Sequence, residues 1–341
     1  MGVPASRTWD LDYLIGMAAR VFAARGVPPA VARSAAKALV QAEVAGIGTH
    51  GLSRISQYCA LLDSGRLEAA ALPAVIRSHG ATALVDAGHG LAYAACELAV
   101  DTAVALARRY GAAFVGVTRS SHAGALGLTL EPVADAGLVG LAFSNAPAAM
   151  PLWGGTSAVL GTNPVAACFP RPGQDPIVVD MAMTSVTRGQ ILEAARAGQP
   201  IPEDWALDAA GQPTTDAEAA LAGTLFPAGG VKGNMLALTF ELLCTALTGA
   251  ALSAETRPFY EVEGTHASIG QAFLAIDPGA LAGASTYVER VDAFVVAAQA
   301  SGAARLPGAR RFALRRAAVA DGVALSPALL AQLEQLLETA P

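Results

Sequence analysis

A strand, a glycine turn and a long helix follow one another near residue 90, and this succession constrains the fold most. Residues 83–87 are typical of a short buried strand, Gly88-His-Gly90 of a tight turn, and residues 91–109 of a helix. Another short strand is expected over residues 114–118. Units of this kind build sheets that are covered by helices. The sequence therefore predicts an α/β protein.

The same turn lacks the fingerprint of a Rossmann dinucleotide-binding site. Tyr93 stands where that fingerprint has its third glycine, and no acidic residue follows a second strand at the usual distance. A lone Gly-x-Gly is weak evidence. We therefore do not expect residues 88–90 to bind a dinucleotide.

The chain is rich in apolar residues, but their distribution along the sequence does not predict a membrane protein. It has 341 residues, enough for a large core and two or three subdomains, with 53% hydrophobic and 15% charged residues. Much of the excess is alanine spread along the chain. The longest apolar run, residues 235–252, contains Glu241. We expect a buried helix there, in a core or a subunit interface, and no membrane partner.

The net charge, the cysteines and the N-terminal residues argue against several other classes of protein. The net charge of −6 leaves no basic stripe for nucleic acid. The four cysteines are widely scattered without a C-x-x-C pair, which indicates reduced core thiols, and we expect no metal. Charged residues within the first thirty positions exclude a signal-peptide core. The sequence predicts a soluble, cytoplasmic and oligomeric protein.

A glycine-punctuated turn over residues 45–54 carries the strongest candidate for chemistry. His50 precedes a helical pattern, and Arg54 follows four residues later on the same face. A helix N-terminus disfavours imidazolium, so this histidine can be held neutral. A guanidinium one turn away can grip a carboxylate with two hydrogen bonds. On this stretch alone, a loop histidine and a surface arginine remain the commoner explanation.

Other polar groups stand at the ends of expected strands and at helix entrances. His122 lies among small residues that open a helix, a site that can hold phosphate or can be a tight packed turn. Thr162 belongs to a proline-fixed turn suited to a polar ligand, whereas an aspartate such as Asp180 at a strand end is more often a helix cap. Lys232 stands among glycines without the Walker spacing. Residues 304–311 contain the densest cluster of positively charged side chains in the chain. This cluster is either an anion-binding site or a solvated loop.

Taken in order and spacing, these segments resemble the malate/L-lactate dehydrogenase-like family, from about Val31 to Arg311. That family includes ureidoglycolate, sulfolactate and diketogulonate oxidoreductases and reductases of cyclic ketimines. The segments that carry the resemblance are Thr49-His-Gly-Leu-Ser-Arg54, Ser121-His-Ala-Gly124, Leu160-Gly-Thr-Asn-Pro164, Val179-Asp-Met-Ala182 with Arg188-Gly189, Gly229-Gly-Val-Lys-Gly233 and Arg305-Leu-Pro-Gly308.

The resemblance implies a fold of the L-sulfolactate dehydrogenase type, α/β but not Rossmann, and typically a homodimer. Its helical domain would take residues 1–72 with 312–341. A discontinuous nicotinamide-binding domain with a largely antiparallel sheet would take residues 73–135 with 253–311. A third domain, residues 136–252, would supply substrate contacts and an interface helix.

The resemblance also implies roles for residues that match the family motifs. His50 would donate or accept the proton with support from Thr49, and Arg54 would bind the substrate carboxylate. Thr162 and Arg188 would contact substrate. The residues that would hold NAD(P) are His122, Ala123, Gly124, Ala125, Leu126, Asp180, Met181, Ala182, Lys232, Arg305, Pro307, Gly308, Arg310 and Arg311. The arginines favour NADP(H) over NAD(H), because a 2′-phosphate needs cationic partners.

Two positions depart from the family pattern and leave the substrate open. Ala123 replaces an aromatic residue, which leaves space near the expected cofactor. Gln190 replaces the aspartate of imine-reducing relatives and cannot take a proton. The leading hypothesis is hydride transfer to C2 of a small 2-oxo acid, or its reverse. The alternatives are reduction of a cyclic imino acid such as pyrroline- or piperideine-2-carboxylate, and a non-catalytic relative that only binds NAD(P).

Overall fold

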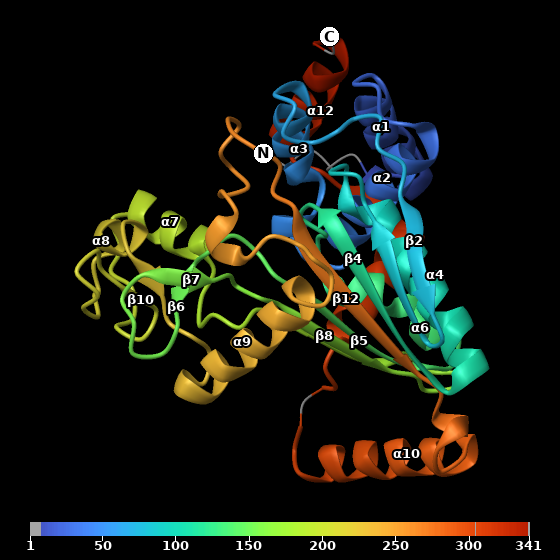
Figure 1. Ribbon diagram of the computed structural model, residues 1–341. Coiled ribbons are helices and arrows are strands. Elements are labelled where there is room, and N and C mark those ends of the chain that lie inside the picture. The colour runs from blue at the N-terminus through green and yellow to red at the C-terminus, as the bar shows by residue number, and fades with distance from the viewer. Residues whose placement is uncertain (1–7, 304, 340–341) are drawn as a thin grey trace, which may run out of the picture.

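The computed structural model describes residues 8–303 and 305–339, and a mixed seven-stranded sheet runs through its middle (Figure 1). Only β3 and β4 pair in parallel within this sheet. The largely antiparallel, non-Rossmann arrangement that the resemblance implied is therefore confirmed. In spatial order the strands are β2 (Ala74–His79), β3 (Thr82–Asp86), β4 (Ala112–Ser120), β12 (Ile269–Ile276), β5 (Val139–Ser144), β8 (Val165–Phe169) and β9 (Ile177–Met181).

The strand–turn–helix unit near residue 90 forms as expected. Helix α4 (Ala92–Tyr110) joins β3 to β4 and ends at Gly111, whose φ of 87° favours glycine. The turn before α4 is filled by protein, because Glu68 N–H donates to the His89 carbonyl over 3.1 Å and a Cβ on Gly90 would collide with Ala71.

A helical part lies above the sheet in Figure 1, and its core combines residues from the early and the late parts of the chain. It contains α1 (Leu11–Ala23), α2 (Pro29–Val44), α3 (Ile55–Asp63) and α12 (Pro327–Glu338). Asp10 caps α1 by accepting the Asp12 and Tyr13 N–H groups, and Pro29 opens α2, as its fixed φ favours. Leu14, Leu39 and Ile55 are fully buried in the core that these helices share.

A smaller lobe lies to the left of the sheet in Figure 1 and has its own apolar cluster around Ile191. It contains α7 (Arg188–Arg196), α8 (Ala217–Leu221) and the short pair β10 (Ala206–Leu207) and β11 (Thr224–Leu225). A second short pair, β6 (Met150–Pro151) and β7 (Ala158–Leu160), connects this lobe to the sheet.

Helix α9 (Gly230–Thr245) has one face in the core and one face in solvent. Ala237, Phe240 and Cys244 are buried on the side that faces β5 and β12. The apolar residues on the outer side are exposed, namely Val231, Met235, Leu236 and Leu242. The expected buried helix is therefore half buried within this chain, and the exposed face is the part that a subunit interface would cover.

The remaining elements complete the chain. They are β1 (Thr8–Trp9) with β13 (Val323–Ala324), α5 (Leu126–Thr129), α6 (Glu131–Asp135), η3 (Ser253–Glu255), η4 (Pro278–Ala280), α10 (Ala284–Ala300) and α11 (Ala309–Asp321). Helix α10 stands apart from the sheet at the bottom of Figure 1.

The expected three-domain division stays a prediction. Strands from residues 73–135 with 253–311 and from residues 136–252 join one continuous sheet. Residues 1–7 and 340–341 of the expected helical domain, and Ala304 before the arginine turn, lie outside the described residues.

Candidate active site

Two short 3₁₀ turns carry His50 and Arg54 from α2 to α3. They are η1 (Gly48–His50) and η2 (Leu52–Arg54). Glu43, near the end of α2, accepts the Leu52 N–H at 3.0 Å and thereby fixes the start of the second turn. A Cβ on Gly51 would collide with the Glu43 carboxylate, so glycine is needed there. The glycine punctuation of the sequence thus has a packing reason as well as a conformational one.

The side chains of this segment are tied to one another. Thr49 Oγ1 lies 3.0 Å from His50 Nδ1. Arg54 Nε donates to the Thr49 carbonyl at 2.6 Å, and its Nη1 donates to Gln57 Oε1 at 2.6 Å. These bonds orient the guanidinium beside the histidine and leave Nη2 available to a ligand. The two residues are neighbours as the sequence predicted, but not on one helical face, because Gly51 is extended between the two turns and α3 begins only at Ile55.

His50 is held neutral in this setting. Burial lowers its pKa to about 4, and the charges of Arg54 and Arg311 add to the effect. A neutral imidazole can accept a proton from a ligand. If Nδ1–H donates to Thr49 Oγ1, the lone pair stands on Nε2, and this is the tautomer that a general base needs.

His122 lies beside His50, at the end of β4. The two ring centroids are 5.3 Å apart and the planes are inclined by 30°. The ring of Phe259 meets His122 at 5.3 Å with a 67° inclination. Burial lowers the pKa of His122 well below its usual value, and the neighbouring His50 and Arg54 lower it further. Both histidines of the site are therefore neutral near pH 7.

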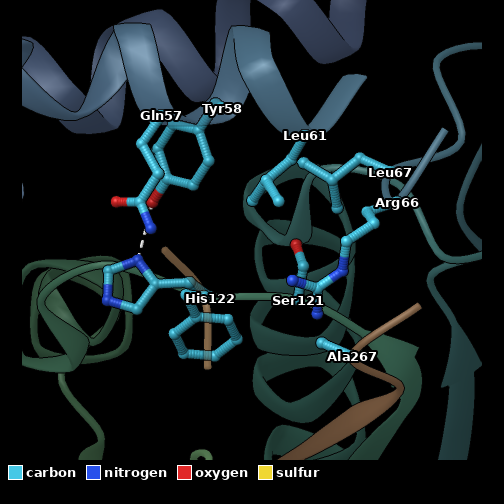
Figure 2. Close-up of a pocket in the computed structure, with 9 residues that line it drawn as sticks. Gln57, Tyr58, Leu61, Arg66, Leu67, Ser121, His122 and Ala267 are labelled. Carbon is cyan, nitrogen blue, oxygen red and sulfur yellow. Dashed lines mark hydrogen bonds between the residues drawn. The ribbon is translucent and has the colours of Figure 1, made fainter. Parts of the chain in front are cut away.

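Two buried tyrosines that the sequence did not single out as site residues hold His122. Tyr58 Oη lies 2.6 Å from His122 Nδ1 and 2.8 Å from Tyr93 Oη. Figure 2 shows Tyr58, on α3, and His122 pointing toward one another. The sequence carried no local signal of this group, because Tyr58 lies 64 positions before His122 and 35 before Tyr93.

A very small cavity is lined by Tyr58 and His122 among other residues (Figure 2). Its volume of about 10 Å³ suits a single water molecule. The buried Arg66 borders it and donates to the backbone carbonyls of Pro258, Glu261 and Thr265. Arg66 therefore fixes the loop that places Phe259 against His122.

A larger cavity of about 220 Å³ opens beside His50. The segment that the resemblance assigned to the cofactor, Ala123 to Ala125, forms part of its wall. Gly124 has a φ of 70°, and a Cβ there would lie 3.0 Å from the Tyr93 ring. The small residues of this segment thus keep the backbone close to the buried tyrosines and keep the cavity open.

Asp180 and Arg311 meet at the other edge of the site. Arg311 Nη1 donates to Asp180 Oδ2 at 2.9 Å, and a Cβ on Gly127 would collide with both side chains. Burial raises the pKa of Asp180, although the charge of Arg311 opposes this shift. Because Arg311 also lowers the pKa of His50, its guanidinium lies close enough to act on the site. Chain segments near residues 50, 127, 180 and 311 are therefore brought together.

The turn before α11 contributes the other expected cofactor residues. The Pro307 carbonyl accepts the Val178 N–H at 3.2 Å, and Gly308 has a φ of 86° beside Val178. Arg305 and Arg310 are exposed. This turn is thus bound to β9 at Val178, two residues before Asp180.

The other expected site residues lie on separate elements. Thr162 is half-buried, and its carbonyl accepts the Met183 N–H at 2.8 Å. Lys232 is exposed in the first turn of α9, and Met181 and Ala182 end β9 and begin the segment after it. The described contacts join none of these residues directly to His50.

Arg188 and Gln190 have structural partners in the smaller lobe. Arg188 donates to the carbonyls of Leu221 and Gly223, both at 3.0 Å. Gln190 forms a capping box with Thr187 at the start of α7. The role of Arg188 in substrate binding stays a prediction, since two of its donors serve the backbone here.

Comparison with known proteins decides the family. Residues 9–334 match the model of the malate/L-lactate dehydrogenase family. The chain belongs to that family. It is 44% identical over 311 residues to a (2R)-3-sulfolactate dehydrogenase (NADP(+)) of Chromohalobacter salexigens, covering 91% of this chain and 92% of the relative.

Further relatives are named as reductases of cyclic imines. A Delta(1)-pyrroline-2-carboxylate reductase of Ancylobacter novellus is 36% identical over 315 residues, which are 92% of each chain. The structure of the Δ1-piperideine-2-carboxylate reductase of Pseudomonas syringae matches with a TM-score of 0.91 at 33% identity, covering 97% of this chain and all of that one. The sulfolactate dehydrogenase of Methanocaldococcus jannaschii matches with a TM-score of 0.89 at 29% identity, covering 97% of both chains. This member of the malate/L-lactate dehydrogenase family is thus an oxidoreductase that uses a nicotinamide cofactor.

The residues of this chain fit such a cofactor. Within the described residues, the backbone N–H groups of residues 122–126 donate to no protein oxygen, and Ala123 to Ala125 form part of the cavity wall beside His50. The cationic Arg311 lies nearby, and Arg305 and Arg310 are free of ion pairs among the described contacts. Free N–H donors and guanidinium groups are what a dinucleotide phosphate requires.

No group of three or more His, Cys, Asp or Glu among residues 8–303 and 305–339 is arranged to hold a metal ion. In the same part of the chain, no helix combines the length and the apolar composition that a membrane crossing needs.

Proposed function

We propose that this protein uses NADP(H) to interconvert a small 2-hydroxy acid and its 2-oxo acid at C2. The observation that carries the proposal is the pair formed by His50 and Arg54. A neutral histidine lines a cavity whose wall includes Ala123 to Ala125, and an oriented guanidinium lies next to that histidine. The sulfolactate dehydrogenase at 44% identity supports both the substrate class and the preference for NADP(H).

Arg54 would bind the substrate carboxylate. Its Nε and Nη1 are held by Thr49 and Gln57, so the guanidinium is oriented before the ligand arrives. A carboxylate fixed in this way presents C2 in one orientation, and positioning of this kind supplies a large part of catalysis. Thr162 and Arg188 would make further contacts to the substrate.

The cofactor would lie against residues 122–126 and residues 180–182. Lys232 and the segment from Arg305 to Arg311 would bind its phosphates, and the arginines Arg305, Arg310 and Arg311 support NADP(H). When bound, the nicotinamide supplies or accepts the hydride at C2 of the substrate. The protein contributes the binding, the orientation and the proton.

His50 would move that proton. In oxidation, the neutral imidazole takes the proton of the C2 hydroxyl. In reduction, His50 must first be protonated, although Arg54 and Arg311 oppose this in the free protein. A bound carboxylate beside Arg54 offsets that positive charge, so substrate binding raises the pKa of His50. Thr49 would hold the imidazole in the required tautomer.

Reduction of a cyclic imino acid is the second candidate. The pyrroline- and piperideine-2-carboxylate reductases among the relatives favour it, because their substrates also have a carboxylate next to the reducible carbon. Gln190 weighs against a mechanism copied from relatives with an aspartate there, since its amide caps α7 and has no proton to exchange.

A substrate panel separates these possibilities. Purified protein would be mixed with NADPH or NADH and with 3-sulfopyruvate, pyruvate, oxaloacetate, pyrroline-2-carboxylate or piperideine-2-carboxylate, and cofactor oxidation followed at 340 nm. We expect the highest kcat/KM with NADPH and a 2-oxo acid. A higher value with a cyclic imine would establish the second candidate. Cofactor binding without turnover on any substrate would indicate a non-catalytic relative.

We also propose that the protein is a cytoplasmic homodimer. Cys59, Cys96, Cys168 and Cys244 are all free and buried, which is typical of a reducing compartment. The exposed apolar face of α9 supports a subunit interface, because a face of that kind is usually covered.

A further inference from the structure

A buried carboxyl on α9 has no part in the roles proposed so far. Glu241 is 3% exposed, and none of the ion pairs within the described residues includes it. Its oxygens accept the Ser253 N–H at 2.7 Å, the Ser253 hydroxyl at 2.6 Å and the Asn163 side-chain amide at 2.8 Å. Because a buried carboxyl is costly unless its oxygens are hydrogen-bonded, these contacts tie α9 to two other segments of the chain.

The Asn163 side chain has one orientation in this cluster. Its Nδ2 donates to the Ala237 carbonyl at 3.1 Å as well as to Glu241. A carbonyl can only accept, so rotation of the amide would set Oδ1 against the Ala237 oxygen. Oδ1 lies instead beside Gly161, buried without a protein partner among the described residues. The amide therefore directs both of its N–H bonds at α9.

The backbone of Asn163 needs this support. Its φ of 34° is in the left-handed region, which residues with a Cβ rarely adopt and asparagine tolerates better than most. The Leu160 carbonyl accepts the Ala149 N–H at 2.8 Å, which fixes the start of the turn. The Pro164 carbonyl accepts the Ser144 N–H at 3.2 Å, which fixes its end. The two side-chain bonds to α9 thus restrain the middle of the turn.

Thr162 precedes Asn163 in this turn. It is half-buried between the buried Gly161 and Asn163, so it is the residue of the three that a ligand can reach. Its carbonyl accepts the Met183 N–H at 2.8 Å, next to the segment that we expect to hold the cofactor. The direction of the Thr162 side chain therefore depends on the conformation that Asn163 keeps.

We propose that Glu241 is a positioning residue, which acts through Asn163 to direct Thr162 toward the substrate. Glu241 does not touch the ligand itself, because its carboxyl is enclosed by Ser253 and Asn163. The kinetic part of this inference rests on the proposed contact of Thr162 with the substrate, whereas the restraint on the turn does not.

Substitution of Glu241 by glutamine breaks the restraint and keeps the shape. The amide oxygen is needed by the Ser253 N–H, so the amide nitrogen would face Asn163 Nδ2, donor against donor. We expect Glu241→Gln to raise KM for the best substrate of the panel roughly fivefold to tenfold, as for the loss of one hydrogen bond. NADPH affinity, followed by fluorescence, should stay within about twofold, because Lys232 stands about two and a half turns earlier in α9. An unchanged KM, or an equal loss of NADPH affinity, would overturn the proposal.

Ser253→Ala is the matched control, because it removes another donor of the same carboxyl and leaves the bond to Asn163. It should lower the melting temperature as Glu241→Gln does and leave KM within about twofold. Glu255→Gln changes an exposed glutamate of η3 and should affect neither quantity. A KM raised as much in Ser253→Ala as in Glu241→Gln would contradict a specific action through Asn163.

A double-mutant cycle tests whether Glu241 acts through Thr162. Thr162→Val removes the hydroxyl and keeps the shape, and it should itself raise KM roughly fivefold to tenfold. In the Thr162→Val background, Glu241→Gln should then add less than about twofold. Effects that multiply, or a wild-type KM in Thr162→Val, would overturn the proposed route.

Hydrogen exchange tests the restraint without turnover. The Met183 N–H reports on the Thr162 carbonyl, and its exchange in the full chain would be followed by mass spectrometry of the peptide that contains it. We expect exchange roughly fivefold to tenfold faster in Glu241→Gln and unchanged in Glu255→Gln. An unchanged rate in Glu241→Gln would overturn the inference even for an inactive protein. Faster exchange without any turnover would support the restraint and count against the proposed function.

A second variant replaces Glu241→Gln in both measurements should that protein not fold. Asn163→Gly lacks the amide, and glycine adopts a positive φ without strain, so the chain can keep its fold while the bond to Glu241 is lost. We expect the same rise in KM and the same faster exchange at Met183. Wild-type values for both would overturn the proposal.

Discussion

The imidazole rings of His50 and His122 face one another at 5.3 Å, although His50 lies between α2 and α3 and His122 follows strand β4 of the sheet. Burial keeps both rings neutral, and Arg54 lowers the pKa of each. Each ring has a different hydroxyl partner at Nδ1, the exposed Thr49 for His50 and the buried Tyr58 for His122. The two imidazoles thus differ in their surroundings, because the hydroxyl partner of His50 is open to solvent and that of His122 is buried.

Substitution of His50 tests the proton transfer. His50→Gln keeps a polar side chain but cannot carry a proton, so we expect kcat to fall by roughly 10²-fold to 10⁴-fold. Binding of NADPH, followed by its fluorescence, should stay within about twofold because the cofactor residues are intact. The matched control is His79→Gln, an exposed histidine on β2, which should behave as the wild type. Equal turnover of His50→Gln and wild type would remove His50 from the mechanism.

Substitution of Arg54 tests carboxylate binding. Arg54→Met removes the charge and keeps the length of the side chain, and we expect KM for the acid substrate to rise roughly 10-fold to 100-fold, as for a charge-assisted hydrogen bond. Arg54→Lys should recover only part of the loss, because an ammonium cannot bond to Thr49, Gln57 and a carboxylate in the same plane. Arg33→Met on α2 is the exposed control. An unchanged KM would place the carboxylate elsewhere.

The pH dependence of the two directions should differ. In the free protein the pKa of His50 is about 4, so kcat/KM for oxidation should not fall until the pH approaches that value. In the reductive direction the protonated form is needed, so kcat should fall as the pH rises through the pKa of the substrate complex. That pKa should be the higher one, because the substrate carboxylate offsets Arg54. Equal pKa values for kcat and kcat/KM would contradict this coupling.

Local spacing was enough to predict part of this site. His50 and Arg54 are four residues apart, and the strand, turn and helix near residue 90 are continuous in sequence, so their patterns can be read directly. Residue patterns alone predicted only an α/β protein. The specific fold was predicted from the family resemblance. The free N–H groups of residues 122–126 could be anticipated from the small residues that follow β4.

Contacts between distant segments could not be predicted. The bonds from Tyr58 to Tyr93 and to His122 depend on how α3, α4 and β4 pack, and no spacing in the sequence encodes that packing. The partners of Arg188 could not be predicted either. Its guanidinium donates to two backbone carbonyls of the smaller lobe, which lie more than 30 positions away in the sequence. The apolar composition of α9 predicted burial but not which of its faces the sheet would cover.

The cofactor preference can be tested at the turn before α11. Arg310 is exposed and would be available to a 2′-phosphate. We expect Arg310→Ala to raise KM for NADPH roughly 10-fold while KM for NADH changes less than about twofold, because only NADPH has the additional phosphate. Arg290→Ala, on the outlying helix α10, is the control. Equal effects on both cofactors would show that Arg310 does not distinguish them.

The outer face of α9 provides a test of the oligomeric state. Leu242 is 48% exposed there, on the same helical face as Val231 and Met235. If a second copy covers this face, Leu242→Glu buries a charge at the interface, and sedimentation velocity should show a shift from dimer to monomer. Leu281→Glu changes a leucine that is 80% exposed and lies outside α9, and it should leave the dimer intact. A Leu242→Glu protein that sediments as the wild type would exclude this face as the interface.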